Sequence, residues 1–193
     1  MKTMAMALAL AASVLGGPVA AQGGDYAVGE KLRPEVAHPP PAGVRDLVWD
    51  DLVPADWNPR QLLDDAGFDD MKDGDPRANA LLEQLRAEWD KAPVVASLDG
   101  QRVRLPGFVV ALEGDERTVR EFLLVPYFGA CIHVPPPPSN QVVHVMPANP
   151  IAEKLAMYPV WVIGRLRASG KVTEMGAAGY RIDGAAVEAY PWR

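Results

Sequence analysis

Cysteine is almost absent from this sequence, because Cys131 is the only one among 193 residues. A single cysteine excludes an intramolecular disulfide, the bond that stabilises many small exported domains. It also excludes lipid attachment through a lipoprotein signal, which needs a cysteine beside its cleavage point, whereas Cys131 lies far downstream. We therefore expect the protein to depend on a hydrophobic core for its stability.

Long apolar runs and an excess of basic residues are also missing. The longest apolar run, residues 5–15, has about a dozen residues, whereas a membrane-spanning helix needs roughly 20. The 25 aspartates and glutamates outnumber the 19 lysines and arginines, which gives a formal net charge of −6. The overall field of such a protein repels polyanions, so we do not expect a nucleic-acid ligand.

The first 21 residues have the pattern of a secretory signal peptide. Lys2 supplies the positive charge, residues 5–15 form the apolar segment, and Val19 and Ala21 occupy the −3 and −1 positions of a cleavage site. We expect removal of residues 1–21 and a periplasmic mature protein without a transmembrane segment.

The remaining chain divides into an arm and one domain. Residues 22–46 are rich in proline and lack apolar periodicity, which predicts a flexible arm without fixed structure. Residues 47–193 are predicted to form a single globular domain. Its first segment, residues 47–54, clusters aliphatic and aromatic side chains before a proline, and we interpret it as a short helical turn or a clamp docked on the domain.

One helix is predicted over residues 76–90. Asp75 and Pro76 are typical of a helix cap and first turn. Apolar residues then recur at helical spacing on one face, at Ala78, Leu81, Leu82, Leu85 and Trp89.

Beyond Lys91 the pattern changes to β-branched residues with a period of two, which predicts strands. The expected strands are residues 94–98, 101–112, 119–127, 141–146, 159–166 and 180–190, with a tight turn at Asp99-Gly100 and a short helix over residues 150–157. From residue 101 onwards the order is β-β-β-α-β-β, which is that of a mainly β, OB-like five-stranded barrel. Gly107 fits the bend that such a barrel needs. The alternative is an open α+β sheet with the helix packed across it.

A possible metal site lies in the most unusual part of the chain, residues 125–141. Cys131 and His133 are two apart and point to the same face of an extended backbone, and His144 on the following strand completes a set of three. A thiolate with two imidazoles suits zinc or copper. Two alternatives stay open: Cys131 and His144 are ordinary buried residues, or a histidine activates the Cys131 thiol as a nucleophile.

The same segment contains a possible docking element. Four consecutive prolines form a stiff extended rod without backbone donors, which suits docking in an aromatic groove, although a rigid loop between two strands is the more ordinary explanation. The predicted partner-binding residues are Tyr127, Phe128, Pro135, Pro136, Pro137, Pro138 and Asn140.

A resemblance to a known protein family rests on three segments of the chain. They are residues 125–141 (VPYFGACIHVPPPPSNQ), 107–110 and 161–164. The chain resembles, from Trp49 to about Arg167, a bacterial family of exported proteins that carries only a domain-of-unknown-function label. The resemblance implies no activity. It implies proteins that are often encoded beside an ABC transporter and a zinc-binding periplasmic component.

These observations favour a non-catalytic periplasmic accessory protein that binds a transition metal, zinc above all, and assists an envelope transport system. The alternative is an interaction module without a metal, which binds a partner protein or a cell-wall glycan through the proline-rich loop and a face of the barrel.

Overall fold

The structure, a computed structural model, describes residues 26–32, 39–59, 61–68, 71, 75–133 and 136–191. The predicted signal peptide lies outside these residues. In chain order the elements are β1 (Arg45–Asp46), η1 (Trp49–Leu52), α1 (Gln61–Asp65), α2 (Pro76–Trp89), η3 (Ala96–Leu98), β2 (Arg102–Gly114), β3 (Thr118–Val125), η4 (Ser139–Gln141), β4 (Val143–Pro147), β5 (Ile151–Ala152), α3 (Glu153–Ala156), β6 (Val160–Arg167), β7 (Lys171–Thr173), β8 (Gly176–Ala178) and β9 (Tyr180–Ala189).

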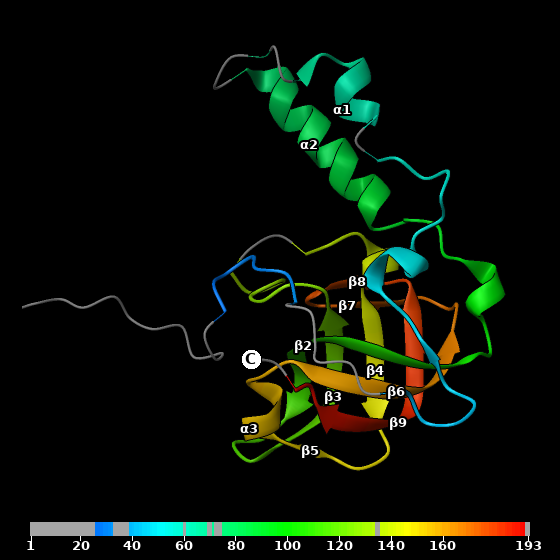
Figure 1. Ribbon diagram of the computed structural model, residues 1–193. Coiled ribbons are helices and arrows are strands. Elements are labelled where there is room, and N and C mark those ends of the chain that lie inside the picture. The colour runs from blue at the N-terminus through cyan, green and yellow to red at the C-terminus, as the bar shows by residue number, and fades with distance from the viewer. Residues whose placement is uncertain are drawn as a thin grey trace, which may run out of the picture.

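Five strands close into a barrel (Figure 1). β2 pairs with β3, β3 with β4, β4 with β9, β9 with β6, and β6 again with β2. All these pairings are antiparallel except the parallel pair β4–β9. The helix α3 lies between β4 and β6 in the chain, so the β-β-β-α-β-β order and the closed OB-like barrel are confirmed. The open-sheet alternative is wrong because the β2–β6 pairing closes the sheet on itself.

β2 closes the barrel because it changes partner in its middle. Residues 102–107 pair with β6, and residues 108–114 pair with β3. Gly107 lies at the change, where a Cβ would come within 2.8 Å of Leu124 Cγ and 2.9 Å of Trp49 Cζ2. Glycine is therefore needed where β2 crosses β3 and where the Trp49 ring lies against both.

The alternation along the strands produces two apolar clusters. On β3, Phe122 and Leu124 point into the barrel, whereas Leu123 and Val125 point outwards. The outer cluster is covered by the 126–142 loop and by Tyr26, whose ring meets Phe108 edge to face at 5.0 Å. The barrel therefore has a packed interior and one side of its exterior that is also buried.

The helical turn predicted within residues 47–54 is present as η1, which follows β1 in the chain. The backbone N–H of Leu47 donates to Arg104 O at 3.0 Å. The Tyr180 hydroxyl, buried in the core, donates to Leu52 O at 2.7 Å and accepts from the N–H of Val95 at 2.6 Å. One buried tyrosine thus joins η1, the segment after α2 and β9.

The prediction that residues 22–46 form an arm without fixed structure is wrong for the parts that the structure describes. Tyr26 and Val44 are buried, and β1 runs parallel to β2. Burying the Tyr26 ring on Phe108 supplies the anchor that the proline-rich composition did not reveal.

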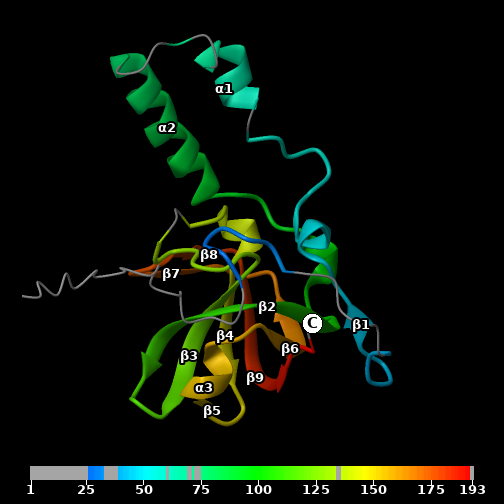
Figure 2. The same ribbon diagram turned by 60° about the vertical axis from the view of Figure 1, so that its left-hand side comes forward.

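The predicted helix is confirmed as α2, which begins after Asp75. The Asp75 side chain accepts a hydrogen bond from the N–H of Arg77 at 2.9 Å. Figures 1 and 2 show α1 and α2 together on one side of the barrel, projecting from it. Leu85 is the buried residue of α2, so the helix does not lie across the sheet.

Three details of the strand prediction change. Residues 94–98 contain the 3₁₀ turn η3 instead of a strand, because the N–H of Val95 is taken by the Tyr180 hydroxyl. The 150–157 helix shortens to α3, preceded by β5, which pairs with β3. The hairpin of β7 and β8 was not predicted. None of the helices described is long and apolar enough to span a membrane.

The crowding at Gly107 gives a test of this architecture. We expect Gly107→Ala to lower the free energy of unfolding by about 2–3 kcal/mol, because the new methyl group collides with a core leucine and with backbone. Gly43→Ala is the control: Gly43 has a positive φ of 72° but open space around it, so only conformational strain of roughly 1 kcal/mol applies. Urea unfolding of both variants measures the difference, and equal losses would contradict the close crossing.

Candidate functional site

A groove of about 450 Å³ lies where the clamp, the arm and β2 meet. Its lining comes from segments that are far apart in the sequence: Lys31, Leu32, Val48, Trp49, Asp50, Pro106, Pro126, Tyr127, Gln141 and Tyr190. Most of these side chains are apolar or aromatic. A concave, mostly apolar surface with a few polar groups is typical of a ligand site.

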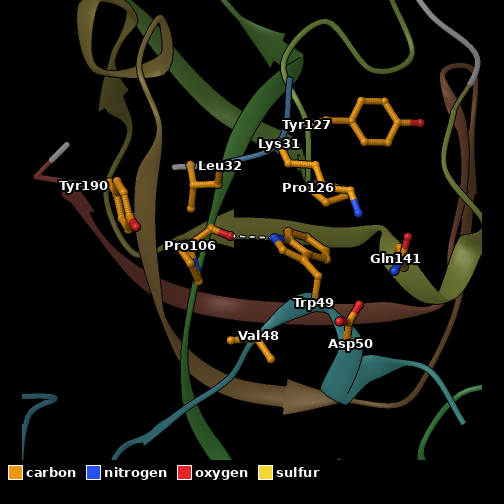
Figure 3. A pocket seen from close by; sticks show the side chains of 10 residues that line it. All are labelled: Lys31, Leu32, Val48, Trp49, Asp50, Pro106, Pro126, Tyr127, Gln141 and Tyr190. Atoms are coloured by element: carbon orange, nitrogen blue, oxygen red, sulfur yellow. Dashed lines mark hydrogen bonds between the residues drawn. The ribbon is translucent and has the colours of Figure 1, made fainter. Parts of the chain in front are cut away.

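Trp49 occupies the middle of the groove. Figure 3 shows its indole between Pro106 on one side and Asp50 and Gln141 on the other. The indole Nε1–H donates to Pro106 O at 2.9 Å, and the ring edge lies over Gly107. A fixed aromatic ring with its polar atom already satisfied presents a rigid apolar surface to a ligand.

Three polar side chains complete the lining. Lys31 supplies a cation, Asp50 an anion and Gln141 an amide that both donates and accepts. They come from the arm, η1 and η4 respectively. The groove therefore offers one charge of each sign beside a largely apolar floor.

The arm passes beside the groove as an extended segment. Lys31 forms an antiparallel bridge with Tyr127. The N–H of Gly29 donates to Phe128 O at 2.8 Å, and the N–H of Phe128 donates to Glu30 O at 3.0 Å. This edge of the 126–128 segment thus pairs with extended chain through backbone hydrogen bonds, as an added strand does.

Two of the predicted partner-binding residues lie at this place. Tyr127 lines the groove, and burial raises the pKa of its phenol to about 12. Phe128 is half-buried and meets Phe108 edge to face at 5.7 Å. Tyr127 therefore contributes to the groove lining, and both Tyr127 and Phe128 pack against the outer apolar cluster.

The proline segment is used differently from the prediction. Pro137 is buried, and Pro136 and Pro137 line a cavity of about 160 Å³ together with Trp89 of α2. The rod faces an aromatic side chain of its own chain. Pro135 lies outside the described residues, and Pro138 directly precedes η4.

Asn140, also predicted to bind a partner, is fully buried. Its Nδ2 donates to Pro93 O at 3.0 Å, which ties η4 to the segment after α2. Pro137 and Asn140 are therefore structural, because neither is open to a partner at the surface.

The three predicted metal ligands, Cys131, His133 and His144, lie in different surroundings. Cys131 has a positive φ of 64° and packs half-buried against the outer apolar cluster. Burial raises the pKa of its thiol to about 11, so the thiolate that a metal or a nucleophilic reaction needs is scarce at neutral pH. His133 is exposed, and its N–H donates to Gly129 O.

His144 belongs to a different group, the polar cluster of Glu121, His144 and Lys171. Its Nε2 lies 2.7 Å from Glu121 Oε1 and 3.2 Å from Lys171 Nζ. Lys171 Nζ also donates to Glu121 Oε1 at 2.6 Å. Lys171 and, secondly, His144 hold the pKa of Glu121 below its usual value. The cluster joins β3, β4 and β7.

Within the described chain, no three His, Cys, Asp or Glu side chains gather so as to hold a metal ion. Cys131 and His133 are not joined by His144, whose Nε2 faces a carboxylate and an ammonium group. A positive charge at this distance repels a metal cation. The predicted three-ligand zinc or copper site does not fit the residues as they are arranged.

Sequence reasoning missed most of the groove. Leu32, Pro106 and Tyr190 come from three separate segments, and no spacing along the chain connects them. One signal was present: Gly107 lies at the predicted bend, and a glycine inside a strand often marks a tight bend or a place of close approach.

The fold and the groove define a small closed β-barrel with a ligand-type groove on its outer side. Comparison with known proteins gives the family. The model of DUF3299, a family of proteins of unknown function, matches residues 49–189. The chain belongs to the DUF3299 family, which confirms the predicted membership of a domain-of-unknown-function family.

One solved structure supports the same conclusion. The chain is similar to a DUF3299 family protein from Pseudomonas aeruginosa PAO1 in its crystal structure, with 40% sequence identity and a TM-score of 0.60. The match covers 78% of this chain and 98% of that one. No curated protein matches the chain.

The polar cluster predicts a specific pH dependence. Because the pKa of Glu121 is lowered in the folded protein, its stabilising contribution is present above the ordinary pKa of a glutamate and is lost as the pH falls through the lowered value. Glu121→Gln should cost about 1–3 kcal/mol at pH 7.

The loss should shrink as the pH falls towards 3, and urea unfolding between pH 7 and pH 3 measures it. Glu188→Gln, at an exposed position of β9, is the control and should change stability little. A Glu121→Gln loss that does not depend on pH would contradict the ion pairing.

Proposed function

We propose that this protein is a non-catalytic, exported binding module whose groove at Trp49 takes an extended, apolar segment of a partner protein in the cell envelope. The observation that carries the proposal is the rigid Trp49 ring at the centre of a largely apolar groove. The partner class follows the resemblance noted in the sequence, which points to an envelope ABC transport system.

The surroundings of the groove support a protein partner. Val48 lines it and is 62% exposed, a high value for a large apolar side chain. Ile132 and Val28, also exposed, lie on the loop and the arm that flank Tyr127. Exposed apolar side chains gathered around a concave surface are typical of interaction sites.

The composition of the lining favours a peptide over a cell-wall glycan. Each sugar ring carries several hydroxyl groups, and burying them without hydrogen-bond partners is costly. The polar side-chain groups in the groove are those of Lys31, Asp50 and Gln141 and the hydroxyl groups of Tyr127 and Tyr190, and the rest of the lining is apolar. An aromatic or large aliphatic side chain on an extended peptide needs no more than these, and the 126–128 segment already pairs with extended chain.

Selection of peptides tests the proposal. Peptides that bind the mature protein are selected from a displayed library. The binding of each selected peptide is then measured by titration with fluorescence anisotropy. We expect peptides that share an aromatic or large aliphatic residue. We also expect Val48→Glu, which puts a charge into the groove, and Trp49→Ala to weaken their binding by about tenfold or more, as at interface hot spots.

Val172→Glu is the matched control, because Val172 is 85% exposed on β7 and does not line the groove. It should leave binding within about twofold, as substitutions outside an interface do. Failure to select any peptide, or equal binding by Val48→Glu, would sink the proposal.

The same titrations distinguish peptide binding in the groove from the metal-dependent function that was predicted from Cys131, His133 and His144. Binding that needs added zinc or copper and disappears in Cys131→Ser/His133→Ala would favour that function. Binding that survives a chelator and the double substitution favours the groove. Export is checked by intact-mass spectrometry of the protein released from the periplasm. The mass should be that of a chain that begins at Gln22.

A further inference from the structure

Four arginines share one outer face of the barrel, although the protein is acidic overall. Arg102 lies on β2, Arg165 and Arg167 on β6, and Arg181 on β9, and these three strands are neighbours in the sheet. All four side chains are exposed. In Figure 1, β6 and β9 lie side by side and carry three of them.

The strand register puts these charges directly opposite one another. Arg102 is the cross-strand partner of Arg165, and Arg167 is the partner of Arg181. Opposed residues lie on the same face with their Cα atoms about 4.5–5.5 Å apart. Like charges in this position destabilise a sheet, so two such pairs on adjacent strands call for a compensating anion.

Arg104, on the same strand, shows how a structural arginine has its charge and its hydrogen-bond donors paired. It lies two residues after Arg102 on β2 and is 2% exposed. Its guanidinium makes two hydrogen bonds to the Asp46 carboxylate, at 2.7 and 2.8 Å, and stacks over the Trp161 ring at 4.2 Å. Within the described part of the chain, Arg102 and Arg165 neither pair with a carboxylate nor stack on an aromatic ring.

Asp183 on β9 is the cross-strand partner of Arg165, but its carboxylate is paired with Arg181, and Arg102 and Arg165 form no ion pair within the described part of the chain. Arg165 Nη1 donates to Gly100 O, a neutral carbonyl. Arg181 Nε is paired with Asp183 Oδ2 at 2.9 Å, and Arg167 Nη1 lies 4.0 Å from Asp99 Oδ2. The carboxylates of this face therefore serve Arg167 and Arg181.

We propose that Arg102 and Arg165 form an anion site that takes a phosphoryl group, with Arg167 and Arg181 adding to its positive field. A phosphoryl group has three terminal oxygens, so two guanidinium groups can each donate to it in a fork, which a carboxylate with two oxygens matches less well. A phosphoryl group with three terminal oxygens occurs in free phosphates and in the monoester headgroup of phosphatidic acid. The site lies outside the Trp49 groove and does not depend on the function proposed for it.

Calorimetry and vesicle binding distinguish the two sources. The mature protein is titrated with inorganic pyrophosphate at constant ionic strength and is sedimented with phosphatidylcholine vesicles that contain or lack phosphatidic acid. Saturable binding of pyrophosphate indicates a soluble phosphate, whereas binding confined to the phosphatidic acid vesicles indicates a headgroup. Either result supports the site if Arg102→Gln and Arg165→Gln each weaken it about tenfold or more.

Arg117→Gln is the matched control. Arg117 is an exposed arginine in the turn after β2, at the far end of that strand from Arg102, and its loss changes the net charge equally. It should leave binding within about twofold, since only the field of the whole protein changes.

Thermal melting supplies a second readout that a failure to fold would not imitate. Without phosphate, Arg102→Gln should melt at or above the wild-type temperature, because one repulsive pair is removed. Pyrophosphate should raise the melting temperature of the wild type more than that of Arg102→Gln. Absence of binding by both probes, or equal binding by the wild type and the two arginine variants, would overturn the proposal.

Discussion

The whole structure depends on the path of one strand. β2 pairs with β6 along its first half and with β3 along its second, and this change of partner converts a sheet into a closed barrel. The change is possible because Gly107 lets β2 cross close to Leu124 and leaves space for the Trp49 ring. The same glycine thus closes the barrel and builds the centre of the groove, so the fold and the candidate site share one constraint.

Much of the barrel follows from short-range patterns, and the sequence reveals them. Alternating apolar residues predict each barrel strand, and Asp75 with Pro76 predicts the start of α2. The failures are cases where a distant residue decides. The Tyr180 hydroxyl accepts a hydrogen bond from the N–H of Val95, which prevents a strand there. Tyr26 is buried against Phe108, although the proline-rich composition around it predicts a flexible arm. Local composition contains neither partner.

The predicted metal site shows the same limit of local spacing. Spacing brings Cys131 and His133 to neighbouring positions, but it does not reveal that Cys131 packs against apolar side chains or that His144 is occupied by Glu121 and Lys171. Two of these residues help to support the barrel: the Cys131 thiol packs against the outer cluster, and His144 belongs to the polar cluster that attaches the β7–β8 hairpin. The two surfaces on which the proposals rest differ in chemistry, because the groove at Trp49 is largely apolar and the face around Arg102 is cationic.

The central claim is that Trp49 and its neighbours form the binding surface, and the indole resonance of Trp49 tests it most directly. In a ¹H–¹⁵N correlation spectrum, the indole N–H of Trp49, bonded to Pro106 O, is recorded while a groove-selected peptide is added. If the groove is the binding surface, this resonance and the Gln141 side-chain amide shift with saturation, while the buried indole N–H of Trp89 on α2 stays in place. An unchanged Trp49 resonance in the presence of bound peptide would contradict it.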